Sequence, residues 1–284
     1  MHRLLSGLSG QGGPVLRDSN VVLAFAFTLI AGLSTGVGGF FTLFFKKTNT
    51  RLLSVVLGFS AGVMVYISFV ELFMEAQQTL MRETGRQNGA WLAVIAFFAG
   101  ILLIGIIDKL IPSWENPHET RKIEDLGHCE WVMDKRLLRT VKLSTLAFVI
   151  HNFPEGIATF ASTIRQPTLG AAITLAIAIH NIPEGIAVAV PSYCATGNRL
   201  KAIGTSFLMG FSEPLGALIA YLILYPFLND TILGCLYAGV AGIMVFISLD
   251  ELLPAAREYG EHHLSMYGLV FGMLFIALGL NLIR

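Results

Sequence analysis

Charged residues are scarce in this chain of 284 residues, because Asp, Glu, Lys and Arg make up 13% of it while hydrophobic residues make up 54%. A water-soluble domain cannot bury so much apolar surface, which excludes a soluble globular protein and predicts an all-α polytopic membrane protein. Nineteen basic residues balance nineteen acidic ones, so no excess positive charge points to nucleic acid as a partner. The three cysteines include no CxxC pair, which argues against a cysteine-type zinc site.

Long apolar runs dominate the rest of the chain. Runs of about 20 apolar residues predict eight transmembrane helices in a single domain, residues 1–284. Turn residues mark most connectors, for example at 166–168, 196–198 and 229–230, and one long connector covers 112–139. The expected spans are 20–45, 51–77, 89–111, 140–165, 168–193, 201–226, 230–256 and 263–283.

The distribution of basic residues predicts an orientation. Eight spans put both chain ends on the same side of the bilayer. Thirteen Lys and Arg residues fall on the face that carries connector 112–139, and six fall on the other face. Because cytoplasmic loops carry the excess of Lys and Arg, the first face is expected to be cytoplasmic and both termini to lie outside.

Two nearly identical polar words interrupt the apolar runs. Residues 151–156 read His-Asn-Phe-Pro-Glu-Gly, and residues 180–185 read His-Asn-Ile-Pro-Glu-Gly. Positions i and i+4 of a helix share one face, so the His and Glu of each word are expected to grip one ion together. The first candidate ligands are therefore His151, Glu155, His180 and Glu184.

Each word also carries an amide, a proline and a glycine. The asparagine stands three residues before the glutamate, so each carboxylate is placed to bridge two ions. The proline leaves a carbonyl without its helical partner, and the glycine lets a neighbouring helix approach closely. Asn152 and Asn181 are therefore further candidate ligands, on two kinked and closely packed helices.

The ligand types predict the chemistry. Imidazole and carboxylate suit Zn²⁺ and other first-row divalent ions. A charged side chain in a membrane span costs about 2.5–3.5 kcal/mol on insertion scales and usually marks an ion pathway. Glu213, beside Pro214, is a third acidic candidate. The residues predict transport of a divalent metal ion through the middle of the bilayer, with one ion or two bound.

A second repeat joins distant parts of the chain. Residues 61–72 match 241–252 at an offset of 180, and residues 32–38 resemble 210–216 at an offset of 178. These matches pair spans that cross the membrane in opposite directions: span 1 with span 6, and span 2 with span 7. Inverted repeats of this kind are common in transporters that bind their substrate at the midplane.

Repeat-equivalent residues also predict a pathway. Glu71 is expected near the external mouth and Glu251, with Asp250, near the cytoplasmic one, where carboxylates concentrate cations. Met64 and Met244 are equivalent as well, although methionine is more often a packing residue than a ligand.

At these residues the chain resembles the ZIP (Zrt/Irt-like) family of divalent metal transporters, in its bacterial ZupT-type branch. The stretches that carry the resemblance read HNFPEGIATF, HNIPEGIAVA, LGFSAGVM and MVFISLDELLP. The resemblance implies eight spans grouped 3+2+3, external termini and a place in the bacterial inner membrane. It also implies import of Zn²⁺, and of Fe²⁺, Mn²⁺, Co²⁺ or Cd²⁺, as substrate rather than cofactor, by an elevator-like movement.

The resemblance further implies a binuclear centre between spans 4 and 5. Its first site would use His151, Glu155, His180, Glu184 and Met64, and its second would use Asn152, Asn181, Glu155, Glu184 and Glu213. Some relatives have Gln-Asp where this chain has His180-Asn181, which leaves metal preference open. The expected partners are metal ions and the lipid bilayer, with no nucleic acid and with a homodimer left open.

Three alternatives compete with an importer. A membrane-embedded metalloenzyme of the di-iron type would favour Glu-x-x-His words, whereas this chain has His-x-x-x-Glu. An exporter or passive channel would use the same ligands, because ligands do not reveal direction. A metal-sensing receptor would bind the ion without moving it.

Overall fold

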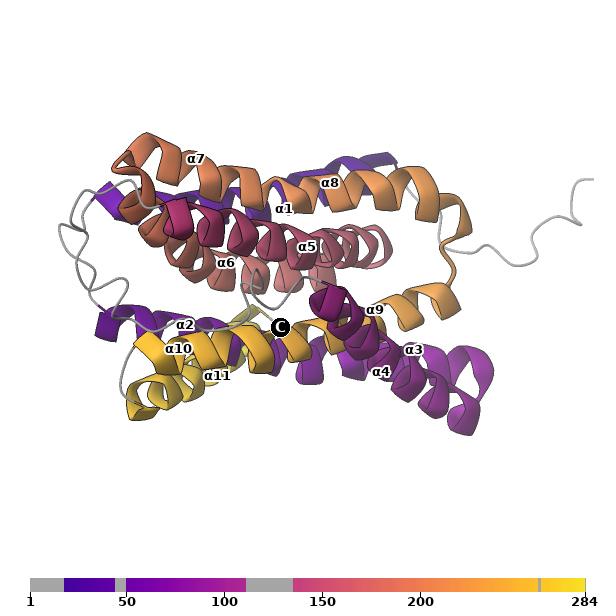
Figure 1. Cartoon of the computed structure of the whole chain (residues 1–284). Helices are drawn as coiled ribbons and strands as arrows, with labels where there is room; N and C mark the ends of the chain where they lie inside the picture. The colour runs from indigo at the N-terminus through magenta and orange to yellow at the C-terminus, as the bar shows by residue number, and fades with distance from the viewer. Residues whose placement is uncertain (1–17, 44–49, 111–134, 260–261, 284) are drawn as a thin grey trace, which may run out of the picture.

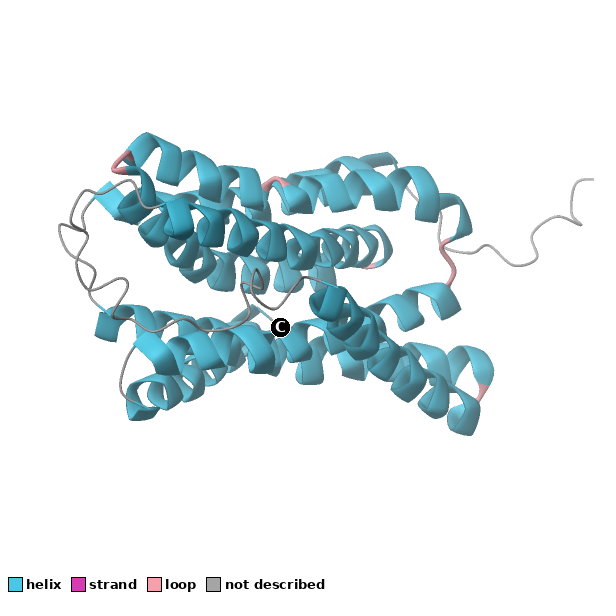
Figure 2. Cartoon of the chain, in the orientation of Figure 1, coloured by secondary structure: helices cyan, strands magenta, loops and turns pink. Residues whose placement is uncertain are grey.

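The computed structural model describes residues 18–43, 50–110, 135–259 and 262–283. Nearly all of these residues are helical, and no strand occurs among them, as Figure 2 shows. The all-α prediction is therefore confirmed. Residues 1–17 and most of connector 112–139 lie outside the described ranges.

The helices form two layers that run side by side along the bundle (Figure 1). The first is here called the motif layer, because it carries both polar words, and it contains α1 (Asp18–Phe40), α5 (Lys135–Arg165), α6 (Pro167–Thr196), α7 (Arg199–Gly210) and α8 (Ser212–Ile219). The second is here called the support layer, and it contains α2 (Thr50–Ile67), α3 (Met74–Thr84), α4 (Arg86–Leu110), α9 (Asp230–Ile247), α10 (Leu253–Tyr259) and α11 (His262–Ile283). Spans 1, 4, 5 and 6 thus share one layer and spans 2, 3, 7 and 8 the other, while the 3+2+3 grouping stays a prediction.

Seven helical stretches in the described part of the chain are long and apolar enough to cross a membrane. Some are composite: α2 continues through a π-helical turn, Ser68–Phe73, into α3, and α9 continues through Ser248–Leu252 into α10. The one expected span that is not among these seven, 140–165, corresponds to α5, which has 31 residues. Basic residues in its first turns and the polar word of residues 151–156 explain why its composition is less apolar.

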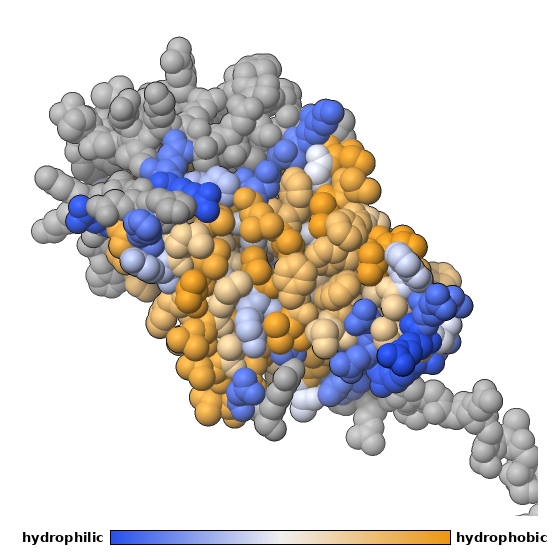
Figure 3. Space-filling model, turned by 90° about the horizontal axis from the view of Figure 1, so that it is seen from below, coloured by the Kyte–Doolittle hydropathy of each residue, from blue (hydrophilic) through white to orange (hydrophobic). Residues whose placement is uncertain are grey.

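The support layer presents a broad apolar surface with polar residues gathered toward its two ends (Figure 3). On α4, Trp91, Ile95 and Leu102 are each more than half exposed, and so are Val270 and Phe271 on α11. A continuous apolar band of this kind is costly in water and matches the hydrocarbon core of a bilayer. The chain is a multi-pass membrane protein.

The connectors with turn residues end and begin helices as expected. Gly197 ends α6 in the left-handed conformation, at φ 64°, and its N–H donates to the Tyr193 carbonyl at 2.8 Å. Asn198 then caps α7 by accepting from the Lys201 N–H at 3.1 Å. Asn229 caps α9 in the same way.

Two close contacts between helices are related to each other by the inverted repeat. Gly185 of α6 lies against the carbonyl of Thr35 on α1, and Gly156 of α5 lies against the carbonyl of Glu213 at the start of α8. The two glycines are equivalent at an offset of 29, and Thr35 and Glu213 are equivalent at 178. A Cβ atom on either glycine would overlap the facing carbonyl, so only glycine permits this approach.

The two halves of the support layer share a local distortion. Ser68 and Ser248, equivalent at an offset of 180, each begin a π-helical turn. Each Oγ donates to the carbonyl four residues earlier, that of Met64 or Met244, at 2.7 Å in both cases. Isolated π-helical turns are frequent at functional sites. These turns place Glu71 and Glu251 at equivalent points of the bundle.

We predict that Gly185→Ala lowers the thermal stability of the protein in detergent. The new Cβ would force α1 and α6 apart, and overpacking of this kind costs about 1–3 kcal/mol. Gly204→Ala is the matched control, because Gly204 is exposed within α7 and its Cβ would meet nothing within 4 Å. Equal melting temperatures for the two variants would contradict the close contact between α1 and α6.

Candidate metal centre

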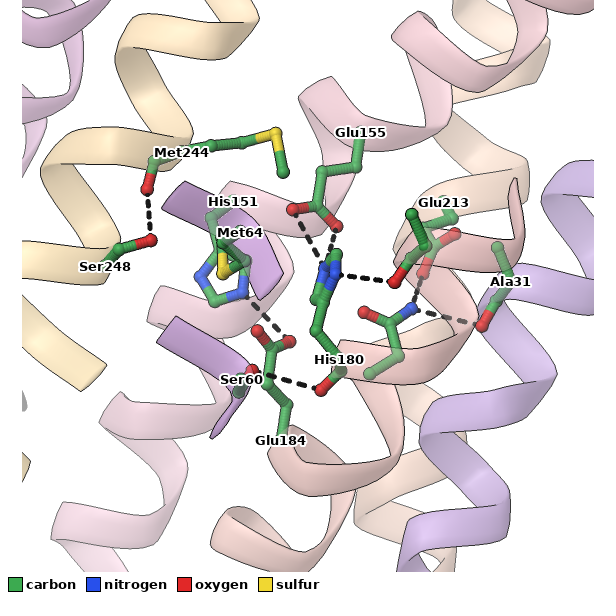
Figure 4. Close-up of polar contacts among 12 residues, drawn as sticks. Ala31, Ser60, Met64, His151, Glu155, His180, Glu184, Glu213, Met244 and Ser248 are labelled. Carbon is green, nitrogen blue, oxygen red and sulfur yellow. Dashed lines mark hydrogen bonds and ion pairs between the residues drawn. The ribbon is translucent and has the colours of Figure 1, made fainter. Parts of the chain in front are cut away.

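Four ionisable side chains meet where α5 and α6 lie against each other (Figure 4). His151 and Glu155 come from α5, and His180 and Glu184 come from α6. None of the four is more than 1% exposed. Burial to this degree is rare for carboxylates unless they are paired or neutralised.

The side chains pair across the two helices. His151 Nε2 lies 3.2 Å from Glu184 Oε2, and His180 Nε2 lies 3.3 and 3.4 Å from the two oxygens of Glu155. Each imidazole thus contacts the carboxylate of the other word, while shared binding of one ion by the His and Glu of a word stays a prediction. The antiparallel packing of α5 and α6 brings each imidazole opposite the other helix's carboxylate, which sequence spacing alone does not reveal.

A second polar group adjoins this one and is not symmetric. The amide Nδ2 of Asn181 donates to Glu213 Oε1 and to the carbonyl of Ala31, the latter at 3.1 Å. Asn152, the repeat equivalent of Asn181, is fully buried, and neither atom of its amide makes a hydrogen bond within the described residues. The difference follows from the sequence. The repeat equivalent of Glu213 is Thr35, so Asn152 has no glutamate in the place that Glu213 occupies for Asn181.

Several buried oxygen atoms of the two groups have no hydrogen-bond partner among the described residues. They are Asn152 Oδ1, Asn181 Oδ1, Glu184 Oε1 and Glu213 Oε2. Leaving a buried polar atom unpaired costs about 1–3 kcal/mol, more for a charged group. The number of unpaired oxygen atoms in one place fits a site that binds a cation.

The donors are arranged in pairs. The described residues hold no set of three or more His, Cys, Asp and Glu side chains already gathered around one point.

The support layer contributes to the same region. Ser60 of α2 donates from Oγ to the carbonyl of His180 at 3.2 Å. Met64, one turn further along α2, is 0% exposed, and Met244 of α9 is 1% exposed. Figure 4 shows the thioether of Met64 beside the His151 ring and that of Met244 pointing toward Glu155. Both methionines therefore face the centre from the support layer.

The expected pathway residues differ in their exposure. Glu251, predicted near the cytoplasmic mouth, is largely buried, and its Oε2 lies 3.9 Å from His151 Nδ1. Asp250 is exposed, whereas Glu71 is buried in its π-helical turn. Asp250 and Glu251 are adjacent in the π-helical turn of residues 248–252, yet only Glu251 faces inward.

Asp108 is a residue that the sequence did not single out. It lines a small cavity together with His151 and Glu251, between α4, α5 and α9. It belongs to neither polar word and to no repeat, and its place beside Lys109 near a helix end resembles that of an ordinary solvated acid. Only the fold brings it toward the centre.

A membrane-spanning bundle that buries imidazole, carboxylate, amide and thioether groups between two layers describes a transporter of metal ions. Residues 19–141 and 132–279 match the family model described as ZIP Zinc transporter. The chain is 56% identical to zinc transporter ZupT of Lysinibacillus sphaericus over 94% of this chain and 99% of that protein. It is 52% identical to zinc transporter ZupT of Clostridium perfringens over 93% of this chain and 97% of that one. The chain belongs to the ZIP family and is a transporter rather than an enzyme.

We predict that Asn181→Leu and Asn152→Leu have opposite consequences in the metal-free protein. Asn181→Leu leaves the buried Glu213 carboxylate without its amide partner, which should cost about 1–3 kcal/mol of stability. Asn152→Leu removes an amide that has no partner, and should be neutral or stabilising.

Thermal unfolding in detergent, with and without Zn²⁺, measures both effects. Asn152→Leu should also shrink the rise in melting temperature that Zn²⁺ produces, because the free amide oxygen is a candidate ligand. A metal-free protein destabilised equally by both substitutions would show that Asn152 has a structural partner.

Proposed function

We propose that the protein imports divalent transition-metal ions, with Zn²⁺ as the principal substrate, through the centre between α5 and α6. The observation that carries the proposal is the crossed pairing of two buried imidazoles with two buried carboxylates. The relatives named above are zinc transporters, which supports Zn²⁺ as the first substrate. The nitrogen and oxygen donors also suit Fe²⁺, Mn²⁺, Co²⁺ and Cd²⁺, which are proposed as further substrates.

The charge distribution supports the direction of the route. The face with thirteen Lys and Arg residues carries the α1–α2 and α6–α7 connections, and the other face carries the α3–α4 and α5–α6 connections. The α3–α4 end of the bundle is therefore proposed as the outer end of a protein in the bacterial inner membrane, with both termini outside. Glu71 lies toward this end, and Asp250 toward the other.

Binding exchanges water for protein donors. The ion loses its hydration shell as the two His–Glu pairs open toward it, with neutral imidazoles and ionised carboxylates as ligands. Met64 adds a thioether from the support layer. Asn152, Asn181 and Glu213, with the shared carboxylates, are the proposed ligands of a second ion.

The inner route begins at His151. The cavity that this imidazole shares with Glu251 and Asp108 offers the departing ion two further carboxylates. When neighbouring sites bind an ion with similar affinity, the ion can move from one to the next and is not trapped at the first. The homodimer that the sequence leaves open is not required by this route, because every proposed donor comes from one chain.

We predict that replacing both His151 and His180 by alanine lowers ⁶⁵Zn²⁺ uptake into metal-starved cells by roughly 10- to 100-fold or more, because both pairs lose their nitrogen ligand. His263→Ala, an exposed histidine at the start of α11, is the control and should transport normally. Surface labelling must show equal amounts of each protein in the membrane. Full uptake by the correctly inserted double variant would end the assignment of the centre.

An exporter or a passive channel would use the same donors, so direction needs its own measurement. In liposomes with the protein in one known orientation, we expect Zn²⁺ flux from the α3–α4 end to exceed flux from the opposite end at equal gradients. Equal flux in both directions with no saturation would indicate a channel. Binding without flux would indicate a receptor.

A further inference from the structure

A polar cavity of about 360 Å³ opens at the α3–α4 end of the bundle. It lies where α3 and the start of α9, in the support layer, face the turn between α5 and α6 in the motif layer. Its lining contains two carboxylates, two guanidinium groups and several neutral side chains: Glu75, Thr79, Arg82, Arg165, Gln166, Leu169, Asp230, Leu233 and Tyr237.

One ion pair at this cavity joins the two layers. Arg165, the last residue of α5, places Nη2 2.5 Å from Oδ2 of Asp230, the first residue of α9. Both side chains are partly shielded, at 36% and 28% exposure. The second pair of the cavity, Arg82 with Glu75 at 3.7 Å, lies within α3 and joins nothing across the layers. Only the first pair would have to break if the layers moved apart here.

On the side of the cavity that is nearer the metal centre, the lining includes Tyr237 of α9. Tyr237 is 1% exposed, lines this polar space and has Ser162 as the neighbour of its hydroxyl. Seven residues further along α9, on the same helix face, stands Met244. Between the cavity and the centre the core is closed by buried side chains, among them Met64 and Met244.

The other end of the bundle differs. There His151 itself lines a small cavity with Glu251 and Asp108, so a residue of the centre borders that cavity directly. At the α3–α4 end, by contrast, buried side chains separate the centre from the larger cavity.

We propose that the cavity at the α3–α4 end is the entrance for the metal ion and that the Arg165–Asp230 ion pair is its gate. The inference rests on the proposed function. In the closed state the two guanidinium groups balance Glu75 and Asp230. When the motif layer carries Arg165 away, the lining keeps two carboxylates against one guanidinium, so opening makes the entrance attractive to a cation. The Tyr237 hydroxyl, which lines the cavity, then offers an oxygen to the hydrated ion.

The first test locks the gate. Arg165→Cys and Asp230→Cys are combined in a protein whose three native cysteines are serines, and the pair is bridged with a short, reducible bis-methanethiosulfonate reagent. We expect ⁶⁵Zn²⁺ uptake to fall at least tenfold on bridging and to return on reduction. Recovery after reduction shows that the variant is folded, and each single-cysteine protein treated in the same way is the control.

The second test opens the gate. A cysteine at Leu233, which lines the cavity and is 5% exposed, reports access to a membrane-impermeant thiol reagent added outside. Arg165→Gln should speed its labelling by roughly two- to fivefold, the effect expected of a partly exposed ion pair. Arg82→Gln removes the same single positive charge from the cavity without breaking a contact between layers, and should leave the labelling rate unchanged.

Undiminished uptake by the fully bridged protein would overturn the gate while leaving the metal transport of the proposed function intact. Equal labelling rates in the Arg165→Gln protein and its parent would do the same. Absence of uptake by the unbridged parent, with its centre unaltered, would instead count against the proposed function itself.

Discussion

The constraint on which the structure depends is the burial of carboxylates inside an apolar bundle. Glu155, Glu184 and Glu213 are each no more than 1% exposed. Burying an isolated charge costs too much free energy, so each carboxylate needs a partner both with and without a bound ion. Two have an imidazole and the third has an amide. Everything else in the fold can be understood as the means of bringing these partners together.

The inverted repeat supplies that means. Glycines at equivalent places, Gly156 and Gly185, let α5 and α6 approach the backbones of α8 and α1, which fixes the depth at which the two polar words meet. The π-helical turns of the support layer do the same for the acids at equivalent positions 71 and 251. Nearly identical words on opposed helices then place each imidazole against the carboxylate of the other word. The symmetry is broken where the repeat has Thr35 on one side and Glu213 on the other, and Glu213 forms the second polar group with Asn181.

Most of the fold was predictable from the sequence, because apolar runs and turn residues are local signals. The all-α membrane fold is confirmed, and the two polar words that meet between α5 and α6 were among the predicted site residues. The pairing inside the centre was not predictable, since spacing along one helix says nothing about the angle at which a second helix crosses it. The depth of Glu251 and the role of Asp108 were hidden for a similar reason: both depend on which helices become neighbours.

The crossed pairs also bear on how a bound ion can leave. A site built only of carboxylates would hold a divalent ion tightly and would be strongly charged when empty. In the proposed centre, each carboxylate that released an ion would again lie 3.2–3.4 Å from an imidazole and so keep a hydrogen-bond partner. The free energy gained from the metal is reduced by the free energy of the pairs that must open, which weakens binding without removing a ligand. A transporter needs this balance, because an ion that is bound too firmly is not released. Asn152 and Asn181, as proposed ligands of a second ion, would provide oxygen donors without adding negative charge to the empty state.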